Sequence, residues 1–405
     1  MKSKLKVIPY CFRTVRVLFA IIALQLPVIG HCDSGNGWFN FFGTKGKDMK
    51  EVATKVAELP EQYKINVHGL DFSLDGNNLA VVSSDEYINI WDWRNSRIVR
   101  TVEKMQGASD GLTTEPIQFS PDGRLFVACH ERAIGNVVVR IWRTDTWEIV
   151  HDIVDNVPGI GCYAIRFTPD GKSLIRVAGR GPILFGDTLV VYDTSTWQPV
   201  WGIYTVPFYP KALTISPDGK FVAIGGSVIN PVGWRSSTPK PTFGNPPLSD
   251  QSAIVIVDLV QRTIVRTIQN TVDFDFGQLA WSPDGANLTA MGQRGWDGRA
   301  NDGHGGYTSG MDTVMVFDAH IGKQIAGDQL VDIAGTALRY TPDGKYLIEG
   351  VMNGRGSGLG VRIWDGQHRE LLQEIPGEVS SLAVSRDGHY FAMGEVGKTV
   401  VWQLK

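Results

Sequence analysis

The sequence is poor in cysteine, in charged residues and in long hydrophobic runs. It contains only 4 cysteines in 405 residues, too few for a small scaffold that depends on disulfide bonds. Its 46 glycines fall far short of the one residue in three that a collagen-like chain needs. Because 43% of the residues are hydrophobic and 20% are charged, disorder of the whole chain is also excluded.

Short motifs of catalysis and cofactor binding are missing as well. The chain has no C-x-x-C-H for haem attachment, no H-E-x-x-H and no G-x-x-x-x-G-K-S/T. Its 8 histidines are scattered and do not indicate a metal site. We therefore expect no cofactor, no metal and no catalytic residue.

Charge limits the range of partners. The formal net charge of the whole chain is -3, but the first 32 residues hold five Lys or Arg residues and no carboxylate. Without them, 34 basic residues stand against 42 acidic ones, which leaves a net charge of -8. We do not expect an acidic protein of this kind to bind nucleic acid or anionic lipid broadly.

The N-terminus has the composition of an export signal. Basic residues between Lys2 and Arg16 precede a mainly apolar run from Val17 to Gly30. This run is too short to cross a bilayer, and no second run of spanning length follows. We therefore expect an exported protein, periplasmic or secreted, with no integral membrane segment after signal cleavage.

Small side chains place the cleavage site before Asp33, with a cut before His31 as an alternative. Acylation of Cys32 and an uncleaved anchor are the other hypotheses for this segment. We predict a signal peptide at 1–32 and an N-terminal extension at 33–50.

A turn phrase, Asp-Gly, is repeated along the rest of the chain. Its glycines recur at intervals of 44 to 66 residues, at Gly76, Gly123, Gly171, Gly219, Gly285, Gly344 and Gly388. In five copies the phrase is Ser/Thr-Pro-Asp-Gly, in which proline sets one turn dihedral and glycine supplies a positive φ. Strand-like segments such as 164–167 and 221–224 flank the turns. Each copy therefore predicts an antiparallel hairpin.

Two more strand-like segments follow the hairpin. The third segment ends in an aromatic or apolar residue and usually an acid, as in Trp91-Asp92, and the fourth follows within a few residues, as in 98–102. Four short antiparallel strands in every ~45 residues, without helical periodicity, predict one blade of a β-propeller. The chain is therefore expected to be all-β, with residues 51–405 forming a seven-bladed β-propeller of four-stranded antiparallel blades.

With these residues the chain resembles the WD-repeat family and its bacterial relatives. Repeated Trp/Tyr-Asp endings and S-P-D-G turns carry the resemblance over roughly Glu51 to Lys405. No blade has the Gly-His dipeptide of the family, and Arg143 and Gln403 replace the acid in two blades. The resemblance implies an interaction platform, while these departures imply blades held by apolar packing without the buried His-Asp network.

The two chain ends predict how the ring closes. The last repeat stops at Lys405 one strand short of a blade, and segment 52–56 follows the pattern of a fourth strand. An N-terminal strand that completes the last blade would remove an exposed edge from the ring. The alternative is an amphipathic helix around Met49, Val52, Val56 and Leu59.

All long insertions fall between the second and third strands of a blade. They are Gly226 to Ser252 and Gly292 to Asp312, with shorter ones at Cys129 to Asn136, Ala178 to Asp187 and Met352 to Gly360. Because strands alternate in direction, these segments share one face, opposite to the Asp-Gly turns; we call it the insertion face. Aromatic and arginine side chains suit a recognition surface, and the candidate binding residues are Trp234, Phe243, Arg294, Trp296, Arg299 and Tyr307. Capping of the central channel is the alternative role for these loops.

Two cysteines lie within the predicted propeller, both near the insertion face. Cys129 ends the second strand of the second blade, and Cys162 begins the first strand of the third. A disulfide bond between them suits an oxidising compartment. Two buried thiols are the alternative, since a sequence does not reveal the Cα separation that a bridge needs.

Two classes of function remain open. We favour a non-enzymatic scaffold whose insertion face binds another exported protein or a peptide, because loops on a rigid framework commonly carry function. The other class is an enzyme or enzyme subunit of the lactonase-like or dehydrogenase-associated kind. A glycan-binding module that uses Trp234 or Trp296 as a stacking plate is a further alternative.

Overall fold

The computed structural model describes residues 49–60, 66–83, 85–104, 116–134, 137–154, 162–177, 189–203, 208–228, 253–269, 274–294, 312–327, 333–353, 358–367 and 370–405. They belong to the second of two units into which the chain divides, Met49–Lys405. Their regular structure is β-strand apart from one short 3-10 helix, η2 (Trp93–Asn95). Within these ranges no helix is long and apolar enough to cross a bilayer.

The described strands form seven sheets of four antiparallel strands, which are the blades. Blade 1 contains β2 (Val67–Phe72), β3 (Asn78–Ser83), β4 (Tyr87–Asp92) and β5 (Arg97–Lys104). Blade 2 contains β6 (Ile117–Phe119), β7 (Leu125–Ile134), β8 (Val137–Arg143) and β9 (Ile149–Val154). Blade 3 contains β10 (Ala164–Phe167), β11 (Ser173–Val177), β12 (Leu189–Asp193) and β13 (Pro199–Ile203).

The other four blades repeat this pattern. Blade 4 contains β14 (Phe208–Ile215), β15 (Phe221–Val228), β16 (Ala253–Asp258) and β17 (Thr263–Gln269). Blade 5 contains β18 (Phe274–Trp281), β19 (Asn287–Arg294), β20 (Asp312–Asp318) and β21 (Gln324–Gly327). Blade 6 contains β22 (Ile333–Tyr340), β23 (Tyr346–Asn353), β24 (Gly358–Asp365) and β25 (Leu371–Ile375). Blade 7 contains β26 (Ser381–Val384), β27 (Tyr390–Glu395), β28 (Lys398–Leu404) and β1 (Ala53–Pro60).

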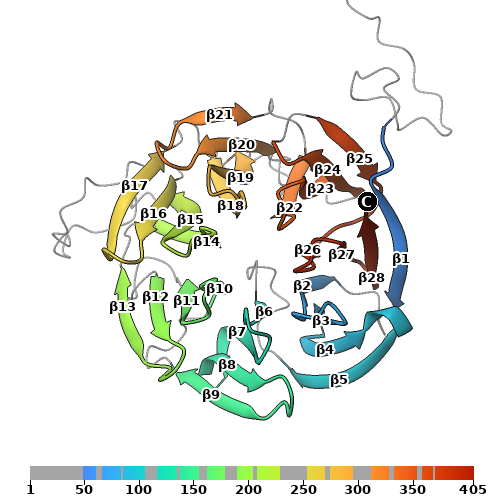
Figure 1. Cartoon of the computed structure of the whole chain (residues 1–405), viewed down its shortest axis with the longest axis horizontal. Helices are drawn as coiled ribbons and strands as arrows, with labels where there is room; N and C mark the ends of the chain where they lie inside the picture. Colours follow the sequence, from blue (N-terminus) through green and yellow to red (C-terminus); the bar gives the residue numbers. More distant parts are fainter. Residues whose placement is uncertain are drawn as a thin grey trace, which may run out of the picture. The chain divides into compact units, whose positions relative to one another are not determined.

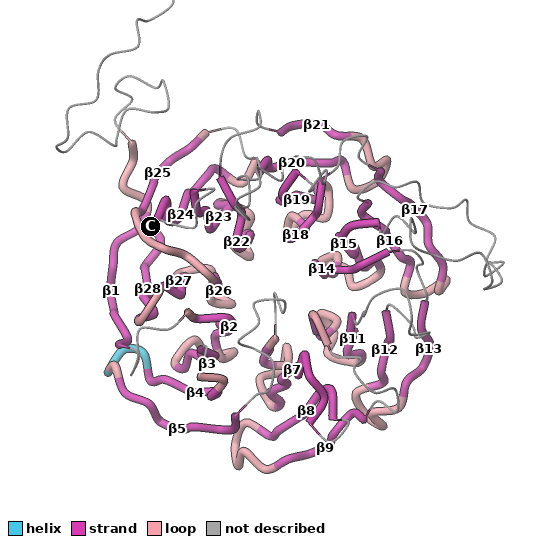
Figure 2. Tube along the Cα trace, turned by 180° about the vertical axis from the view of Figure 1, so that it is seen from behind, coloured by secondary structure: helices cyan, strands magenta, loops and turns pink. Residues whose placement is uncertain are grey.

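The blades follow one another around a ring in chain order (Figure 1). The first strand of each blade lies nearest to the centre, and fourth strands such as β5, β9 and β13 form the outer rim. The view from the opposite side shows the same order (Figure 2). This arrangement confirms the predicted all-β, seven-bladed propeller of four-stranded antiparallel blades.

The repeated Asp-Gly phrase forms the turn between the first and second strands of every blade. The seven turn glycines have φ between 66° and 75°, a backbone conformation that glycine adopts without strain. The Ser or Thr before each turn donates its hydroxyl to the Asp and accepts a backbone N–H from the next strand. In blade 6, Thr341 Oγ1 lies 2.6 Å from Asp343 Oδ1 and 3.0 Å from the Tyr346 nitrogen. The hydroxyl bond lowers the pKa of Asp343, because it stabilises the ionised carboxylate.

The acid at the end of the third strand has a structural role. Asp258 Oδ1 accepts hydrogen bonds from the backbone N–H groups of Val260 and Gln261, at 2.8 and 2.7 Å, and so caps the turn to β17. In blade 2 the equivalent residue is Arg143, whose Nη2 pairs with Asp145 Oδ2 at 2.6 Å. In blade 2 this turn is therefore stabilised by an ion pair in place of a capping carboxylate. The capping bonds account for Asp258 at the end of the third strand as a structural residue.

The first strand of the described chain, β1, pairs antiparallel with the last, β28 (Figure 1). The pairing runs from Ala53 opposite Leu404 to Pro60 opposite Lys398. β1 is thus the outer strand of blade 7, and the alternative of an N-terminal amphipathic helix is wrong. Strand pairing prevails here because it covers the edge that β28 would otherwise expose.

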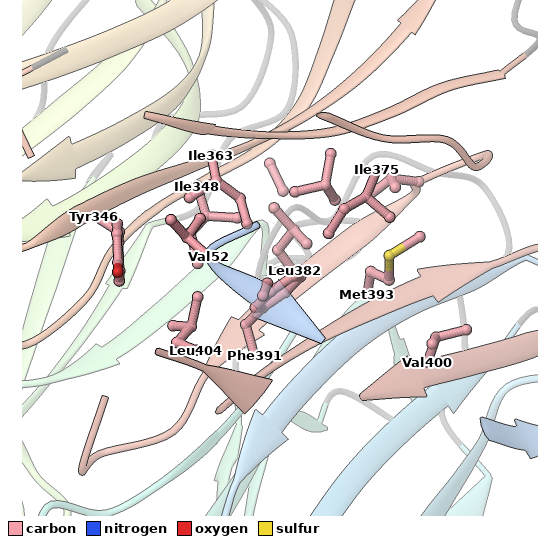
Figure 3. Packing of buried hydrophobic residues seen from close by; sticks show 14 of the residues in the cluster. Val52, Tyr346, Ile348, Ile363, Ile375, Leu382, Phe391, Met393, Val400 and Leu404 are labelled. Carbon is pink, nitrogen blue, oxygen red and sulfur yellow. The ribbon is translucent and has the colours of Figure 1, made fainter. Parts of the chain in front are cut away.

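Apolar side chains fill the space within and between neighbouring blades. Figure 3 shows one such cluster, in which Ile348 and Ile363 of blade 6 pack with Leu382 and Phe391 of blade 7 and with Val52 beside β1. Ile348, Ile363 and Phe391 have no exposed surface. Complete burial of a side chain of this size contributes roughly 1.5–3 kcal/mol, which makes these clusters the main source of cohesion between the blades.

The connections between second and third strands differ around the ring. Blades 1 and 7 have tight turns, where Val82 pairs with Ile88 and Glu395 pairs with Lys398. In blades 3, 4 and 5 the chain leaves the paired strands for the long connections 178–188, 229–252 and 295–311, which lie outside the described residues. These three connections leave adjacent blades at the face opposite to the Asp-Gly turns.

Strands extend into both ends of the two shortest expected insertions. β7 continues to Ile134, which pairs with Val137, and in blade 6 Met352 pairs with Gly358. Polar and glycine-rich composition at 129–136 and 352–360 favours a loop, yet antiparallel pairing needs only backbone donors and acceptors. In blades 2 and 6 the second and third strands therefore continue past the ends that were expected from the sequence.

Candidate functional site

The candidate binding residues of the insertion face lie at the edge of the described chain or outside it. Arg294 is the last residue of β19, where it pairs with Phe274. The other five lie outside the described residues: Trp234, Phe243, Trp296, Arg299 and Tyr307. The structure thus defines where the two longest loops begin and end, and their role in binding remains a prediction.

Cys129 and Cys162 form a disulfide bond with a Cα–Cα distance of 5.4 Å. Both residues are fully buried, in a cluster that includes Val139 and Ile165. Cys129 lies on β7 and Cys162 lies just before β10, so the bond joins blade 2 to blade 3. Of the two alternatives for this pair, the structure has the bridge.

A cavity of about 370 Å³ lies among the first strands of the blades, at the centre of the ring. Residues of β2, β6, β10, β14, β18, β22 and β26 line it. Turn residues such as Pro217, Pro283 and Arg386 also belong to its wall, so the cavity reaches the Asp-Gly face. Its volume falls in the range that is usual for small-molecule sites, ~300–1,000 Å³.

One position of the repeat places a residue from every blade on the wall of this cavity. It lies two residues before the Ser or Thr of the turn and is occupied by Asp71, Gln118, Arg166, Thr214, Ala280, Arg339 and Ala383. A second position, directly after that Ser or Thr, holds proline in five blades and Arg386 in blade 7. We call Arg166, Arg339 and Arg386, with Asp71, the channel cluster.

Asp71 and Arg386 bind the two backbone groups of the same residue. Asp71 Oδ2 accepts a hydrogen bond from the Phe119 N–H at 2.7 Å, and Arg386 Nη2 donates to the Phe119 carbonyl at 3.1 Å. Phe119 belongs to blade 2, Asp71 to blade 1 and Arg386 to blade 7. The cluster therefore connects three blades at the Asp-Gly end of the channel.

Arg166 and Arg339 have equivalent hydrogen bonds in blades 3 and 6. Each donates from Nη1 to the carbonyl oxygen of the residue before it, Ile165 at 3.0 Å and Leu338 at 2.8 Å. These bonds hold both guanidinium groups against the channel wall. Both arginines are half-buried, whereas Arg386 is exposed.

The electrostatics of the cavity follow from burial and from these three arginines. Burial raises the pKa of Asp71, because the ionised carboxylate loses water, and the charges of Arg386, Arg166 and Arg339 oppose that rise. Burial also lowers the pKa of His68, at the other end of β2, which keeps this imidazole neutral at neutral pH. Among the described residues that line the cavity, three arginines accompany one aspartate.

The channel cluster was not predicted from the sequence. Arg166 lay within a segment expected to be a strand, and the turn proline is replaced in two blades, by Leu74 and by Arg386. Aligning the seven turns would have shown that a single inner position varies between Ala, Thr, Gln, Asp and Arg. Among the residues that the structure describes, no group of His, Cys, Asp and Glu side chains is arranged to hold a metal ion.

Residues 54–92 match a family model described as "WD domain, G-beta repeat". The match begins in β1 of blade 7 and ends with β4 of blade 1, so the sequence repeat is offset by one strand from the blade. Together with the ring of seven four-stranded blades, this match shows that the protein is a WD-repeat-like β-propeller. A comparison with curated proteins found no similar sequence.

Among solved structures, the chain is similar to Kuenenia stuttgartiensis hydrazine synthase, with a TM-score of 0.63 and 18% sequence identity. The similarity covers 84% of this chain and 96% of that chain. At this level of identity the similarity concerns the fold alone.

Proposed function

We propose that this protein is an exported, non-enzymatic scaffold that binds another exported protein or a peptide over its insertion face. One observation carries the proposal: three adjacent blades, 3, 4 and 5, have long connections between their second and third strands, while blades 1 and 7 have tight turns. A partner bound by these connections would cover one arc of the ring.

The ends of each long connection are held together by strand pairing. Gly226 pairs with Ala253 in blade 4, and Gln293 pairs with Asp312 in blade 5. Blades 1 and 7 form the same four-stranded sheet with short connections, so a blade of this kind does not require a long one. Loops on a rigid framework are where binding residues concentrate, and the aromatic and arginine residues predicted there are of the type that dominates interface energetics.

Export is part of the same proposal. The N-terminal segment has the order of a signal peptide, and the buried Cys129–Cys162 bond suits an oxidising compartment. We expect the mature protein to begin near Asp33. N-terminal sequencing of the exported protein tests this, and a mature chain that starts at Met1 would contradict it.

The binding role is tested by replacing 229–252 and 295–311 with short Asn-Gly turns. Tagged wild-type and shortened proteins are used to capture partners from the native compartment, and captured proteins are identified by mass spectrometry. We expect the shortened protein to lose a partner that the wild type retains, at an unchanged melting temperature. Substituting Trp234 or Trp296 with alanine should weaken binding by about 1–4 kcal/mol if that residue is an anchor.

A matched control alters the opposite face. Arg124 and Lys345 lie in Asp-Gly turns, so Arg124→Gln and Lys345→Gln should leave capture unchanged. Capture that persists after both loops are replaced would show that the insertion face is not the binding surface.

The second candidate function is a subunit of an enzyme. The structural similarity covers 96% of a chain of hydrazine synthase. A chain with this fold over almost its whole length therefore occurs in a protein named as an enzyme. Absorbance spectra and activity assays of the captured complex separate the two candidates. A partner with its own cofactor or catalytic activity would favour the enzyme subunit.

A further inference from the structure

We propose that the outer rim of blade 1 binds an extended segment of a partner protein, one that carries an aliphatic side chain beside a carboxylate. The site consists of Ile98, Val99 and Arg100 on β5, the outermost strand of that blade (Figure 1). We call these three residues the rim site. It is separate from the insertion face, and the proposal does not depend on the partner that we propose there.

Every outer strand has a β-bulge near its start, where it pairs with the third strand of its blade. In β5, Arg100 pairs with Ile90 and Ile98 pairs with Trp91, so Val99 is the extra residue. The bulge residue is aliphatic in each blade: Val99, Val150, Val200, Val265, Ile325, Leu372 and Val56. It is 41–54% exposed in every blade except blade 6, where Leu372 is buried. The rim therefore presents an aliphatic side chain at the same point of successive blades.

Blade 6 shows how such a bulge is covered. Its bulge residue, Leu372, belongs to the same apolar cluster as Val52, in the segment that leads into β1. The next residue, Gln373, binds the backbone of that segment. Its Oε1 accepts from the N–H groups of Val52 and Ala53, both at 2.7 Å, and its Nε2 donates to the Ala53 carbonyl at 3.1 Å. An aliphatic bulge residue and the polar side chain after it thus hold a further segment of chain against the rim.

In three other blades the residue after the bulge is engaged within the protein. In blade 2, His151 stacks on Trp197 of blade 3, with 6.2 Å between the ring centroids. In blade 3, Trp201 packs against an apolar cluster. In blade 4, Arg266 Nη1 donates to the Ala319 carbonyl of blade 5 at 2.9 Å. These side chains hold neighbouring blades together.

Blade 1 differs, because the residue after its bulge is exposed. The Arg100 side chain has no hydrogen bond or ion pair with the residues that the structure describes. Blades 5 and 7 have Ala326 and Ala57 at this position, without a polar side-chain atom. Ile98 and Val99 are each 47% exposed. Blade 1 therefore combines two exposed aliphatic side chains with a guanidinium group, in the positions that Leu371, Leu372 and Gln373 have in blade 6.

The charges of β5 determine the kind of segment that fits. Arg97 pairs with Asp92 at 3.1 Å, and Glu103 pairs with Arg140 of blade 2 at 2.7 Å. Arg100 lies between these two pairs and is the charge that we assign to the partner. A guanidinium group binds a carboxylate through two parallel N–H···O bonds, so the segment carries Asp or Glu beside its aliphatic residue.

β5 is also an open edge of its sheet. It is the last strand of blade 1, so alternate backbone N–H and C=O groups face away from β4. A second copy of the protein is a poor occupant, because antiparallel pairing that brings Ile98 against Val99 also places Arg97 opposite Arg100. We therefore assign the site to a different protein, whose segment adds a strand to this edge.

Fluorescence anisotropy with labelled peptides tests the rim site in the mature protein. The probes are Thr-Glu-Val-Glu-Val-Thr, its basic counterpart Thr-Lys-Val-Lys-Val-Thr, and Thr-Glu-Ser-Glu-Ser-Thr, which lacks aliphatic side chains. We expect saturable binding of the Glu-Val peptide with a dissociation constant below about 1 mM. The other two peptides should bind about tenfold more weakly or not at all, because each lacks one of the two features that the site recognises.

Variants assign the binding to the rim site. Arg100→Glu should weaken the Glu-Val peptide about 10-fold or more and bind the Lys-Val peptide in its place, because it reverses the charge. Val99→Ser should weaken the Glu-Val peptide about threefold, since it removes apolar contact. The matched controls are Arg124→Glu, at an arginine whose side chain is 86% exposed, and Val200→Ser, at the bulge of blade 3. Both should leave the affinity unchanged.

The reversed preference of Arg100→Glu separates binding from stability, because damage to the fold would weaken both peptides. The proposal is wrong if the Glu-Val peptide does not bind below about 1 mM, or if Arg100→Glu binds it as tightly as the wild type. Equal effects of Val99→Ser and Val200→Ser would also contradict it. Self-association in sedimentation velocity that Val99→Ser abolishes would assign the rim site to a second copy and overturn the proposal. These outcomes leave the proposed role of the insertion face untouched.

Discussion

Asp71 of blade 1 accepts a hydrogen bond from the backbone N–H of Phe119 in blade 2, with 2.7 Å between Oδ2 and N. The next blade repeats this relationship, since Gln118 Oε1 accepts from the backbone N–H of Phe167 in blade 3 at 2.8 Å. In each pair a side chain beside the channel satisfies a backbone donor of the following blade. Blades 1, 2 and 3 are therefore linked at their inner edges by polar contacts as well as by apolar packing.

Removing one of these acceptors should destabilise the propeller. Gln118→Ala leaves the N–H of Phe167, a buried residue, without its side-chain acceptor, and we expect a loss of about 1–3 kcal/mol in the free energy of unfolding. Denaturant unfolding followed by circular dichroism measures the change. Gln261→Ala, at an exposed turn residue, is the control and should alter the free energy by less than about 0.5 kcal/mol. Equal effects of the two substitutions would contradict a role for the Gln118 bond.

The Cys129–Cys162 bond should contribute substantially to stability. It closes a loop with a sequence separation of 33 residues, for which loop-closure entropy predicts roughly 3–4 kcal/mol. We expect the double variant Cys129→Ala, Cys162→Ala to lose about this amount, and reducing agent to have no further effect on it. Thiol titration of the unfolded, unreduced protein that begins at Asp33 provides a direct check. Two reactive thiols in that experiment would mean that the bond is absent.

Leu59 should anchor β1 against the first blade. It is completely buried among Val67, Phe72 and Trp91, whereas Val56 on the same strand is 44% exposed. Leu59→Ala is therefore expected to cost about 2–5 kcal/mol in the free energy of unfolding. Val56→Ala should cost less than about 1 kcal/mol, since it removes little buried surface. If thermal melts showed similar losses for the two variants, closure of the ring through β1 would not depend on this packing.

Acid should destabilise the protein through the turn aspartates. The Thr168 hydroxyl lowers the pKa of Asp170 in the folded state, and the unfolded value is about 3.9. The stabilisation is therefore fully present above the unfolded pKa and is lost as the pH falls through the folded pKa. Thr168→Val should raise the midpoint pH of acid unfolding, and Thr168→Ser, which keeps the hydroxyl, should restore it. An equal shift in Thr168→Ser, which keeps the hydroxyl, would show that loss of the hydroxyl bond is not the cause.

The blades could be predicted from the sequence because each one is specified by short sequence motifs. Asp-Gly turns, the Ser or Thr before them and alternating apolar residues act over fewer than ten positions, so each copy predicts the same hairpin without knowledge of the others. Seven copies then predict seven blades. The segment from Ala53 to Pro60 was harder, because its apolar spacing also suits a helix, and its pairing with β28 depends on residues at the far end of the chain.

The boundaries of the shorter insertions show the limits of composition. Glycine-rich residues 352–360 favour a loop, but Met352 pairs with Gly358 because a neighbouring strand offers its backbone groups. The disulfide is a similar case, since Cys129 and Cys162 are joined only because two blades bring their Cα atoms within 5.4 Å.

The repeat in the sequence was sufficient for the fold class and the number of blades, since turn chemistry and strand periodicity are properties of short segments. The channel cluster depended on the closed ring. Asp71, Arg166, Arg339 and Arg386 are spread over more than three hundred residues of chain, and each looks ordinary in its own blade. Closure of the ring places one inner position from every blade around a single cavity, so side chains remote in sequence share one electrostatic environment.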